Sequence, residues 1–368
     1  MKVPVLELRP AYDELAPELD AAYRRVMASG RYLLGPELEA FEAAYARSCG
    51  AAHCVGVANG LEALQLVLMA LGVRPGDEVI VPSNGYIATW LAVTHAGATP
   101  VACEPDEATH NLDPRRLGSV LTPRTVAILP IHLYGQTADM AAIVDFAARH
   151  GLFVLEDAAQ SHGALCHGRA AGSLGHAAGV SFYPSKNLGA FADAGAVTTS
   201  DAGLADRIRV LRNYGSKERY DHQVQGLNSR LSELQAAFLR VRLARLPGWN
   251  ERRVRLAARY IQALEGVGDL VLPRVPDWAE PVWHLFVVRT RKREALRSYL
   301  ADRGVGTQVH YPVPPHLSGA YQACGGKRGD FPIAERLSDE VLTLPIGPHV
   351  EPAAVDFVCA QIRSFFAA

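Results

Sequence analysis

The sequence contains no uninterrupted apolar run of about 18 residues, the length that a membrane-spanning helix requires. Its opening stretch, MKVPVLELRPAYDEL, is too charged, and its apolar part too short, for a signal peptide. A basic excess, which nucleic-acid-binding proteins usually carry, is also absent, because 37 Lys and Arg side chains are matched by 38 Asp and Glu. We therefore expect a cytoplasmic protein with neither a membrane nor a nucleic acid as partner.

Paired-cysteine motifs are missing as well. No two of the six cysteines are spaced as C-x-x-C, so a structural zinc site is a poor prediction and reduced thiols a better one. His162, Cys166 and His167 lie close together, but no carboxylate or further cysteine is spaced to complete a metal site. The G-x-S-x-G turn of many hydrolases and a glycine fingerprint for dinucleotides are lacking too. We expect no bound metal and neither of these two enzyme classes.

What the sequence does contain is an alternation of short apolar strands and amphipathic helices. The strand-like segments are HCVGV (53–57), DEVIVP (77–82), TPVAC (99–103), VAILPIHL (126–133), LFVLED (152–157), GVSFYP (179–184) and AGAVTTS (194–200). Strands covered by helices on both faces of a parallel sheet read as such continuous apolar runs. The sequence thus predicts an α/β fold with a mostly parallel sheet, in which ligands bind beyond the carboxyl ends of the strands.

The two ends of the chain show other patterns. Two helices are expected near the start, and residues 229–266 read almost entirely as helix. The later predictions are a strand at VWHLFVVRT (282–290), a helix over 293–303, a strand at VGTQVHYP (305–312), an exposed turn over 318–330 and two final helices. With 368 residues, the chain is long enough for a large domain over 1–246 and a smaller α/β domain over 247–368.

Two segments place a charged side chain directly after an apolar strand. In LFVLEDAAQSHGA the acids Glu156 and Asp157 end the strand, and in VSFYPSKNLG Lys186 follows one. Taken singly, an acid there can cap the next turn, and the lysine can be an ordinary surface residue. Together they suggest pyridoxal phosphate (PLP), whose chemistry needs a lysine amine for a Schiff base and a carboxylate that keeps the pyridine nitrogen protonated.

Such a cofactor also needs a site for its phosphate and a flat surface against its ring. The stretch VANGLEALQL follows a strand with Asn59 and Gly60 and then opens a helix, whose first N–H groups can bind an anion. Ser181 could add a hydroxyl, and Tyr86 in PSNGYIATW could stack on the ring. An ordinary strand-to-helix turn and a core aromatic are the alternatives for these stretches, and the residues alone leave them open.

In these motifs the sequence resembles the sugar aminotransferases of the DegT/DnrJ/EryC1/StrS family. The stretches VANGLEAL, PSNGYIATW, LEDAAQSHGA, SFYPSKNLGAFADAGAVTTSD, NYGSKERY and GLNSRLSELQAAFLRVRL occur in the family's order. The resemblance extends from RYLLGPELEAFE to FPIAERLSDEVLTLPIGP, so it covers essentially the whole chain. It implies the aspartate-aminotransferase type of fold (fold type I), PLP as cofactor, and pyridoxamine phosphate as its amino-carrying form.

The resemblance implies a role for each matching residue. Lys186 would form the Schiff base and serve as general acid and base, Asp157 would pair with the pyridine nitrogen, and Gln160 would lie near the phenolic oxygen of the ring. The remaining cofactor contacts would come from the backbone amides of Gly60 and Leu61, the hydroxyl of Ser181, the stacked ring of Tyr86, and Asn228 of the neighbouring subunit. The protein would then be a homodimer with shared active sites.

The resemblance also narrows the substrates to L-glutamate and a nucleotide-linked keto sugar. Leu61 stands where many relatives have threonine, and FADAGAV (191–197) and HYPVPPHLSGAY (310–321) resemble enzymes that aminate C3 of a dTDP-linked 3-keto-6-deoxyhexose. A UDP-linked 2-acetamido-3-keto sugar and a non-catalytic regulatory role remain the alternatives. Lys186 itself argues against the relatives that carry histidine at this position and act as dehydratases.

Two groups of side chains are expected to contact the sugar nucleotide. Tyr183 lies beside the lysine, and His310 and Tyr311 follow a predicted strand, so these three could contact the sugar or its phosphates. The second group is Tyr214, Lys217 and Tyr220, which lie in a polar loop that could touch the nucleotide across the dimer. A plain surface loop explains that second group equally well.

Overall fold

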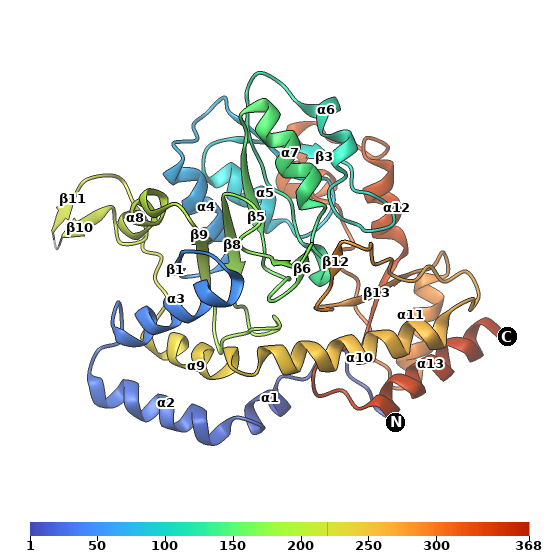
Figure 1. Cartoon of the computed structure of the whole chain (residues 1–368). Helices are drawn as coiled ribbons and strands as arrows, with labels where there is room; N and C mark the ends of the chain where they lie inside the picture. The colour runs from blue at the N-terminus through green and yellow to red at the C-terminus, as the bar shows by residue number, and fades with distance from the viewer. Residues whose placement is uncertain (219, 368) are drawn as a thin grey trace.

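A seven-stranded sheet forms the centre of the larger part of the molecule (Figure 1). The computed structural model describes residues 1–218 and 220–367. The strands are β1 (His53–Val57), β2 (Glu78–Pro82), β3 (Thr99–Cys103), β4 (Thr125–Ile128), β5 (Phe153–Asp157), β8 (Ala177–Ser181) and β9 (Gly195–Thr199). Their order is β1-β9-β8-β5-β4-β2-β3; β9 is antiparallel to β1 and β8, and the other neighbours pair in parallel. The predicted α/β fold with a mostly parallel sheet is confirmed.

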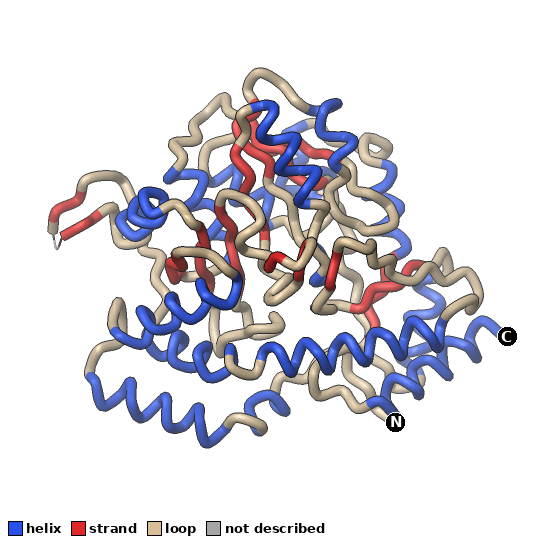
Figure 2. The backbone as a smooth tube through the Cα atoms, viewed as in Figure 1, coloured by secondary structure: helices blue, strands red, loops and turns tan. Residues whose placement is uncertain are grey.

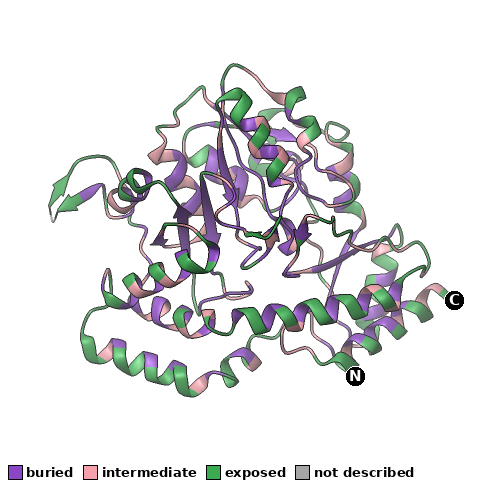
Figure 3. Ribbon diagram, viewed as in Figure 1, coloured by how far each residue is buried: buried purple, intermediate pink, exposed green. Residues whose placement is uncertain are grey.

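Helices cover both faces of the sheet, so β2 and β9 are buried along their whole length (Figure 3). The helices before the C-terminal part are α1 (Arg9–Asp13), α2 (Ala16–Ser29), α3 (Pro36–Cys49), α4 (Gly60–Ala70), α5 (Ala88–His95), α6 (Leu117–Val120), α7 (Met140–His150), α8 (Ala202–Leu211) and α9 (Glu233–Leu243). Val79 and Val81 of β2 pack with α4, α5 and α8 on one face, whereas Ile80 packs with α7 on the other. The continuous apolar runs of the sequence follow from this covering on both sides.

A long helix, α10 (Leu246–Leu264), runs along one side of the molecule from α9 to the C-terminal elements (Figure 2). Those elements are β13 (Phe286–Arg289), α11 (Arg293–Asp302), α12 (Pro332–Glu340), β14 (Val341–Leu344) and α13 (Pro352–Ala367). All of them except α12 share a core with α10, in which Tyr260 stacks on Phe286, and Val3 from the other end of the chain also lies in it. Leu337 of α12 instead packs with Val287 and Val341 in a separate small cluster. The boundary at residue 246 stays a prediction. Within the described residues, no helix combines the length and the apolar character that crossing a membrane demands.

Besides the antiparallel pair of β13 and β14, two small sheets complete the described part of the fold. One contains β6 (Leu165–Cys166), β7 (Arg169–Ala170) and β12 (Ala279–Glu280). The other is a hairpin of β10 (Ser216–Glu218) and β11 (Asp221–His222), which projects from the body of the molecule next to α8 (Figure 1). The hairpin bears on the predicted nucleotide contacts, because Lys217 is part of it.

Two predictions for the C-terminal part are wrong. The segment 305–312 forms no strand; it contacts its neighbours through the single bridges Val305–Val3 and Gln308–Thr343, which are too few to make a ladder. The stretch 318–330 is more than an exposed turn, because it contains the 3-10 helix η4 (Gly319–Cys324). Tyr321 of η4 is buried against Trp90 with ring centres 5.0 Å apart, a long-range contact that local composition does not reveal.

Candidate active site

A cavity of about 470 Å³ opens at the carboxyl ends of β5 and β8, where an open α/β sheet binds its ligands. The predicted residues that line it are Gly60, Leu61, Tyr86, Asp157, Gln160, Ser181, Tyr183, Lys186, His310 and Tyr311. They come from distant parts of the chain, and the alternation of strands and helices brings them together. The residues singled out for the catalytic and most of the cofactor roles thus share one site.

The loop after β8 delivers Lys186 to this cavity in a tight turn. The amide of Lys186 donates to the carbonyl of Tyr183 at 2.8 Å, and the amide of Ala190 donates to the carbonyl of Phe182 at 2.7 Å. Glycine is required at position 189, because a Cβ there would lie 2.4 Å from the carbonyl oxygen of Pro184. Removal from bulk water lowers the pKa of the Lys186 amine from 10.5 to about 8, and the nearby carboxylate of Asp157 offsets part of that effect.

Asp157 ends β5 and is held in place by two hydrogen bonds. The hydroxyl of Thr89 donates to Oδ2 at 2.6 Å, and the amide of Ala159 donates to Oδ1 at 3.2 Å. Thr89 is buried in the first turn of α5 and also lines the cavity. The sequence reading missed Thr89, although its position three residues after Tyr86 places the two near one another at the start of this helix.

The N-terminus of α4 forms the anion-binding end of the cavity. Oδ1 of the N-cap Asn59 accepts a hydrogen bond from the amide of Glu62 at 2.9 Å, which leaves the amides of Gly60 and Leu61 without intrahelical partners. Gly60 lies directly against Ser181, because a Cβ at residue 60 would be 2.6 Å from the Cβ of Ser181. The close approach concentrates two free N–H groups and one hydroxyl where a phosphate can bind.

Gln160 and Tyr311 form the opposite wall. The amide of Tyr134 donates to Oε1 of Gln160 at 2.7 Å, and Nε2 of Gln160 donates to the hydroxyl of Tyr311 at 3.0 Å. Because the Tyr311 oxygen already accepts this bond, its own proton remains available for a ligand. Tyr86, which is 56% exposed, lies with its ring centre 5.3 Å from that of Tyr311, so the predicted stacking residue forms an aromatic rim at the cavity.

The other predicted residues do not line this cavity. Tyr214 and Tyr220 are exposed, and Lys217 faces a different hollow beneath the hairpin. Asn228 is exposed as well, but Ser229 accepts a hydrogen bond from the amide of Ala58 at 3.1 Å, next to the start of α4. All four lie on a surface around the projecting hairpin rather than inside one chain's own cavity.

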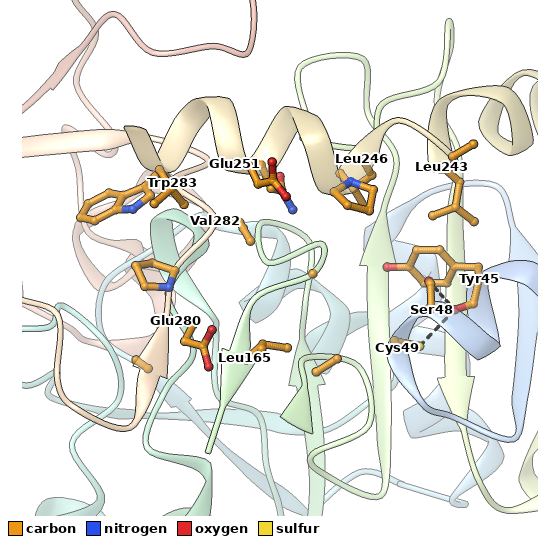
Figure 4. Close-up of a pocket in the computed structure, with 18 of the residues that line it drawn as sticks. Tyr45, Ser48, Cys49, Leu165, Leu243, Leu246, Glu251, Glu280, Val282 and Trp283 are labelled. Atoms are coloured by element: carbon orange, nitrogen blue, oxygen red, sulfur yellow. Dashed lines mark hydrogen bonds between the residues drawn. The ribbon is translucent and has the colours of Figure 1, made fainter. Parts of the chain in front are cut away.

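A larger cavity of about 1330 Å³ lies elsewhere, between α10, the end of α3 and the segment before β13 (Figure 4). Tyr45, Leu246 and Trp283 are among the side chains around it. Among its described lining residues there is no predicted site residue and no lysine. Size alone would therefore select the wrong cavity, whereas the chemistry of the lining selects the smaller one.

The smaller cavity fits PLP on its own evidence. It offers an amine with a lowered pKa, a carboxylate fixed by two donors, free amides at a helix N-terminus and a glycine whose missing Cβ makes the room. These are the groups that a Schiff base, a protonated pyridine and a phosphate require. Fold and site together define the class: a PLP-dependent aminotransferase of fold type I.

Comparison with known proteins agrees with this class. Residues 13–363 match the DegT/DnrJ/EryC1/StrS aminotransferase family. A relative from Streptomyces venezuelae, dTDP-3-amino-3,4,6-trideoxy-alpha-D-glucose transaminase, is 56% identical over 95% of this chain and 92% of its own length. Another from Aneurinibacillus thermoaerophilus, dTDP-3-amino-3,6-dideoxy-alpha-D-galactopyranose transaminase, is 48% identical over 99% of both chains.

Among solved structures, S. venezuelae DesV in complex with a ketimine intermediate superposes with a TM-score of 0.98 at 54% identity, covering 100% of this chain and 99% of DesV. The chain belongs to the DegT/DnrJ/EryC1/StrS aminotransferase family, which uses PLP as its cofactor. The predicted family, fold, enzyme class and cofactor are confirmed.

Proposed function

We propose that the protein transfers the amino group of L-glutamate to C3 of a dTDP-linked 3-keto-6-deoxyhexose. The products are 2-oxoglutarate and a 3-amino-3,6-dideoxy sugar nucleotide. The observation that carries the transfer is the single cavity that holds Lys186 together with the carboxylate of Asp157 and a phosphate-sized cluster of donors. The sugar follows from the two relatives named above, which share a dTDP group and an amine at C3 of a 6-deoxy sugar and differ at C4.

In this function PLP, once bound, supplies a positively charged ring that accepts the electrons released when a C–H bond breaks. Lys186 would move the proton from the α-carbon of glutamate to the cofactor in the first half-reaction, and would move a proton from the cofactor to C3 of the sugar in the second. A pKa of about 8 suits both tasks, because a group that titrates near the working pH can accept and return a proton readily. One lysine can do this on one face of the cofactor.

The other residues of the cavity would position and orient the cofactor. Asp157 would keep the pyridine nitrogen protonated, and Thr89 holds Oδ2 of that carboxylate at 2.6 Å so that it cannot rotate away. The amides of Gly60 and Leu61 and the hydroxyl of Ser181 would bind the phosphate. Gln160 would approach the phenolic oxygen of the ring with its Nε2 group, and Tyr86 would cover the ring.

The sugar nucleotide would enter past the exposed rim. Tyr183 is 53% exposed there, and His310 and Tyr311 line the inner wall, so these side chains suit the sugar and its phosphates. We place Tyr214, Lys217, Tyr220 and Asn228 in the active site of a second copy, because in one chain they surround a projecting hairpin. The functional unit is then a homodimer in the cytoplasm.

The absorbance spectrum of the purified protein with PLP, before and after L-glutamate, tests the first half of this proposal. Glutamate should convert the yellow form to the pyridoxamine phosphate form, and Lys186→Ala should bind cofactor but fail to convert. The second half is tested by measuring turnover of a panel of keto sugars. The panel compares dTDP-linked 3-keto-6-deoxyhexoses with UDP-linked 2-acetamido-3-keto sugars.

The outcomes separate the alternatives. Turnover of the dTDP sugars alone supports the proposal, and turnover of the UDP sugars alone replaces the substrate. A protein that binds PLP but ignores every donor and acceptor would be a non-catalytic member of the family.

A further inference from the structure

A buried chain of hydrogen bonds connects the loop that carries Lys186 with His284, a cavity residue that the sequence reading did not select. Nδ2 of Asn187 donates to Oδ1 of Asn250 at 3.0 Å and to the carbonyl of Val282 at 3.0 Å. Oδ1 of Asn187 faces Nδ1 of His284 at 3.2 Å. All of these polar side chains are at most 9% exposed, so bulk water does not compete for the contacts.

These contacts determine which nitrogen of His284 carries the proton. The carbonyl of Val282 can only accept, so it fixes the Asn187 amide with its nitrogen toward Val282 and its oxygen toward His284. An amide oxygen also can only accept, so Nδ1 of His284 is the donor. Burial, together with the charges of Lys186 and Arg253, holds the pKa of His284 well below its ordinary value, so the ring is neutral and has its lone pair on Nε2.

That lone pair has no partner among residues 1–218 and 220–367, where the hydrogen bond of the His284 ring is the one through Nδ1. His284 lines the same cavity as Lys186. The backbone here is fixed independently, since Nη1 of buried Arg253 donates to the carbonyls of Trp283 at 3.1 Å and His284 at 3.3 Å. The wall of the catalytic cavity thus presents a rigid hydrogen-bond acceptor.

The other groups near Lys186 are less suited to accept a hydrogen bond from its amine. Asp157 accepts from Thr89 and Ala159. Nε2 of His162 donates to the carbonyl of Ser181 at 3.0 Å and its buried Nδ1 has no partner among the described residues, but His162 does not line the cavity. The Tyr311 hydroxyl accepts from Gln160 and has a proton left to donate. Nδ1 of His310 lies 2.8 Å from the hydroxyl of Thr343, which can donate or accept, so the proton position on His310 is not determined.

We propose that His284 is a positioning residue for Lys186: its Nε2 accepts a hydrogen bond from the lysine amine whenever that amine is released. A free lysine on a flexible four-carbon stem would otherwise sample many positions between its two proton transfers. The acceptor favours the ammonium form after the first transfer, so the proton stays close to the carbon that receives it. This role rests on the aminotransferase function proposed above.

The test uses protein loaded with pyridoxamine phosphate, in which Lys186 is free and no turnover is needed. The pH dependence of Lys186 acetylation, followed by mass spectrometry of its peptide, reports the pKa of the amine. His284→Asn keeps a hydrogen-bond donor toward Asn187 but removes the acceptor toward Lys186. His284→Met removes both the donor and the acceptor. His284→Gln places a carbonyl oxygen near the position of Nε2. The matched comparison is His310→Asn, which removes the neighbouring imidazole. A second variant, Tyr260→Phe, controls for general loss of stability, because it removes a buried hydroxyl bonded to the carbonyl of Pro345 at 2.9 Å.

We expect His284→Asn and His284→Met to lower the pKa of Lys186 by about one and to slow the glutamate half-reaction about tenfold with little change in KM. His284→Gln should recover most of both effects, and His310→Asn and Tyr260→Phe should leave the titration unchanged. An unchanged titration in whichever acceptor-free variant folds would overturn the role, as would an equal shift in His310→Asn. If the wild-type protein fails with every sugar, the substrate proposal falls while this titration still decides the role of His284.

Discussion

The amine of Lys186 is buried, so its pKa is lower than that of an ordinary surface lysine. With a pKa of about 8, roughly a tenth of the amine is neutral at pH 7, against about one part in 3,000 for an exposed lysine. The rate of the glutamate half-reaction should therefore rise with pH and level off above about 8. Stopped-flow absorbance at a series of pH values measures this. A rate that keeps rising in proportion to hydroxide up to pH 10 would contradict the lowered pKa.

Substitutions at Asp157 and Thr89 test the contribution of the Asp157 carboxylate to catalysis in two steps. Asp157→Asn removes the charge that would hold the pyridine nitrogen protonated, so we expect a loss of kcat of about 10² to 10³-fold. Thr89→Val removes only the 2.6 Å hydrogen bond to that carboxylate, so about tenfold is expected. Steady-state kinetics with saturating PLP measures both. Equal losses in the two variants would mean that Thr89 does more than orient Asp157.

The residues that could be predicted are those whose role depends on local sequence. Lys186 and Asp157 each follow an apolar strand, and strand ends in a parallel sheet converge on one edge. His284 could not be predicted in this way, because it precedes its strand and reaches the cavity only through packing of the C-terminal part. The burial of Tyr321 could not be predicted either, because its partner Trp90 lies far away in the sequence, in α5.

At the scale of elements, the helices and strands around the site could be predicted because residues in the sequence mark where each one begins and ends. The helix α3 starts at Pro36 and ends before Gly50, whose φ of 75° suits glycine. The prediction of a strand at 305–312 is wrong because the composition of this segment is typical of a strand, but its neighbours offer only isolated bridges. Pairing partners, unlike helix caps, are not encoded within the segment itself.

The contact between the start of α4 and the end of β8 gives a prediction about cofactor binding. In Gly60→Ala the new Cβ would lie 2.6 Å from the Cβ of Ser181, so the helix must move away from the strand. Overpacking of this kind costs about 1 to 3 kcal/mol, and the displaced amides would no longer converge with the hydroxyl. We expect at least tenfold weaker PLP binding, measured by fluorescence titration. Gly248→Ala is the matched control, because a Cβ there meets nothing within 4 Å.

At the scale of the whole molecule, buried histidines should make the protein sensitive to acid. Burial lowers the pKa of His110 and His162 to about 3 and that of His310 to about 4. Below the ordinary value of 6.5 the unfolded chain binds protons that these rings in the folded state do not, so stability falls as the pH drops from 6.5 toward 4. Each such histidine costs about 2 kcal/mol at pH 5.

Thermal unfolding of the PLP-free protein between pH 7 and 5 measures this loss. His162→Gln, which removes one of the buried titrating rings, should flatten the dependence. A melting temperature independent of pH over that interval would show that the rings are protonated in the folded state.

The position of Asn228 leads to the last prediction, which concerns the assembly. Asn228 is exposed beside the hairpin and does not line the cavity of its own chain, whereas the family resemblance implies that it contacts the phosphate. If a second copy supplies it, Lys186→Ala and Asn228→Ala inactivate different halves of one site. Each variant alone should be nearly inactive. After mixing, unfolding and refolding, half of the dimers are mixed, and one of the two sites in each has both residues intact. Activity should return to about a quarter of the wild-type value. If each chain instead used its own Asn228, the mixture would be no more active than its components, since no chain in it would carry both residues.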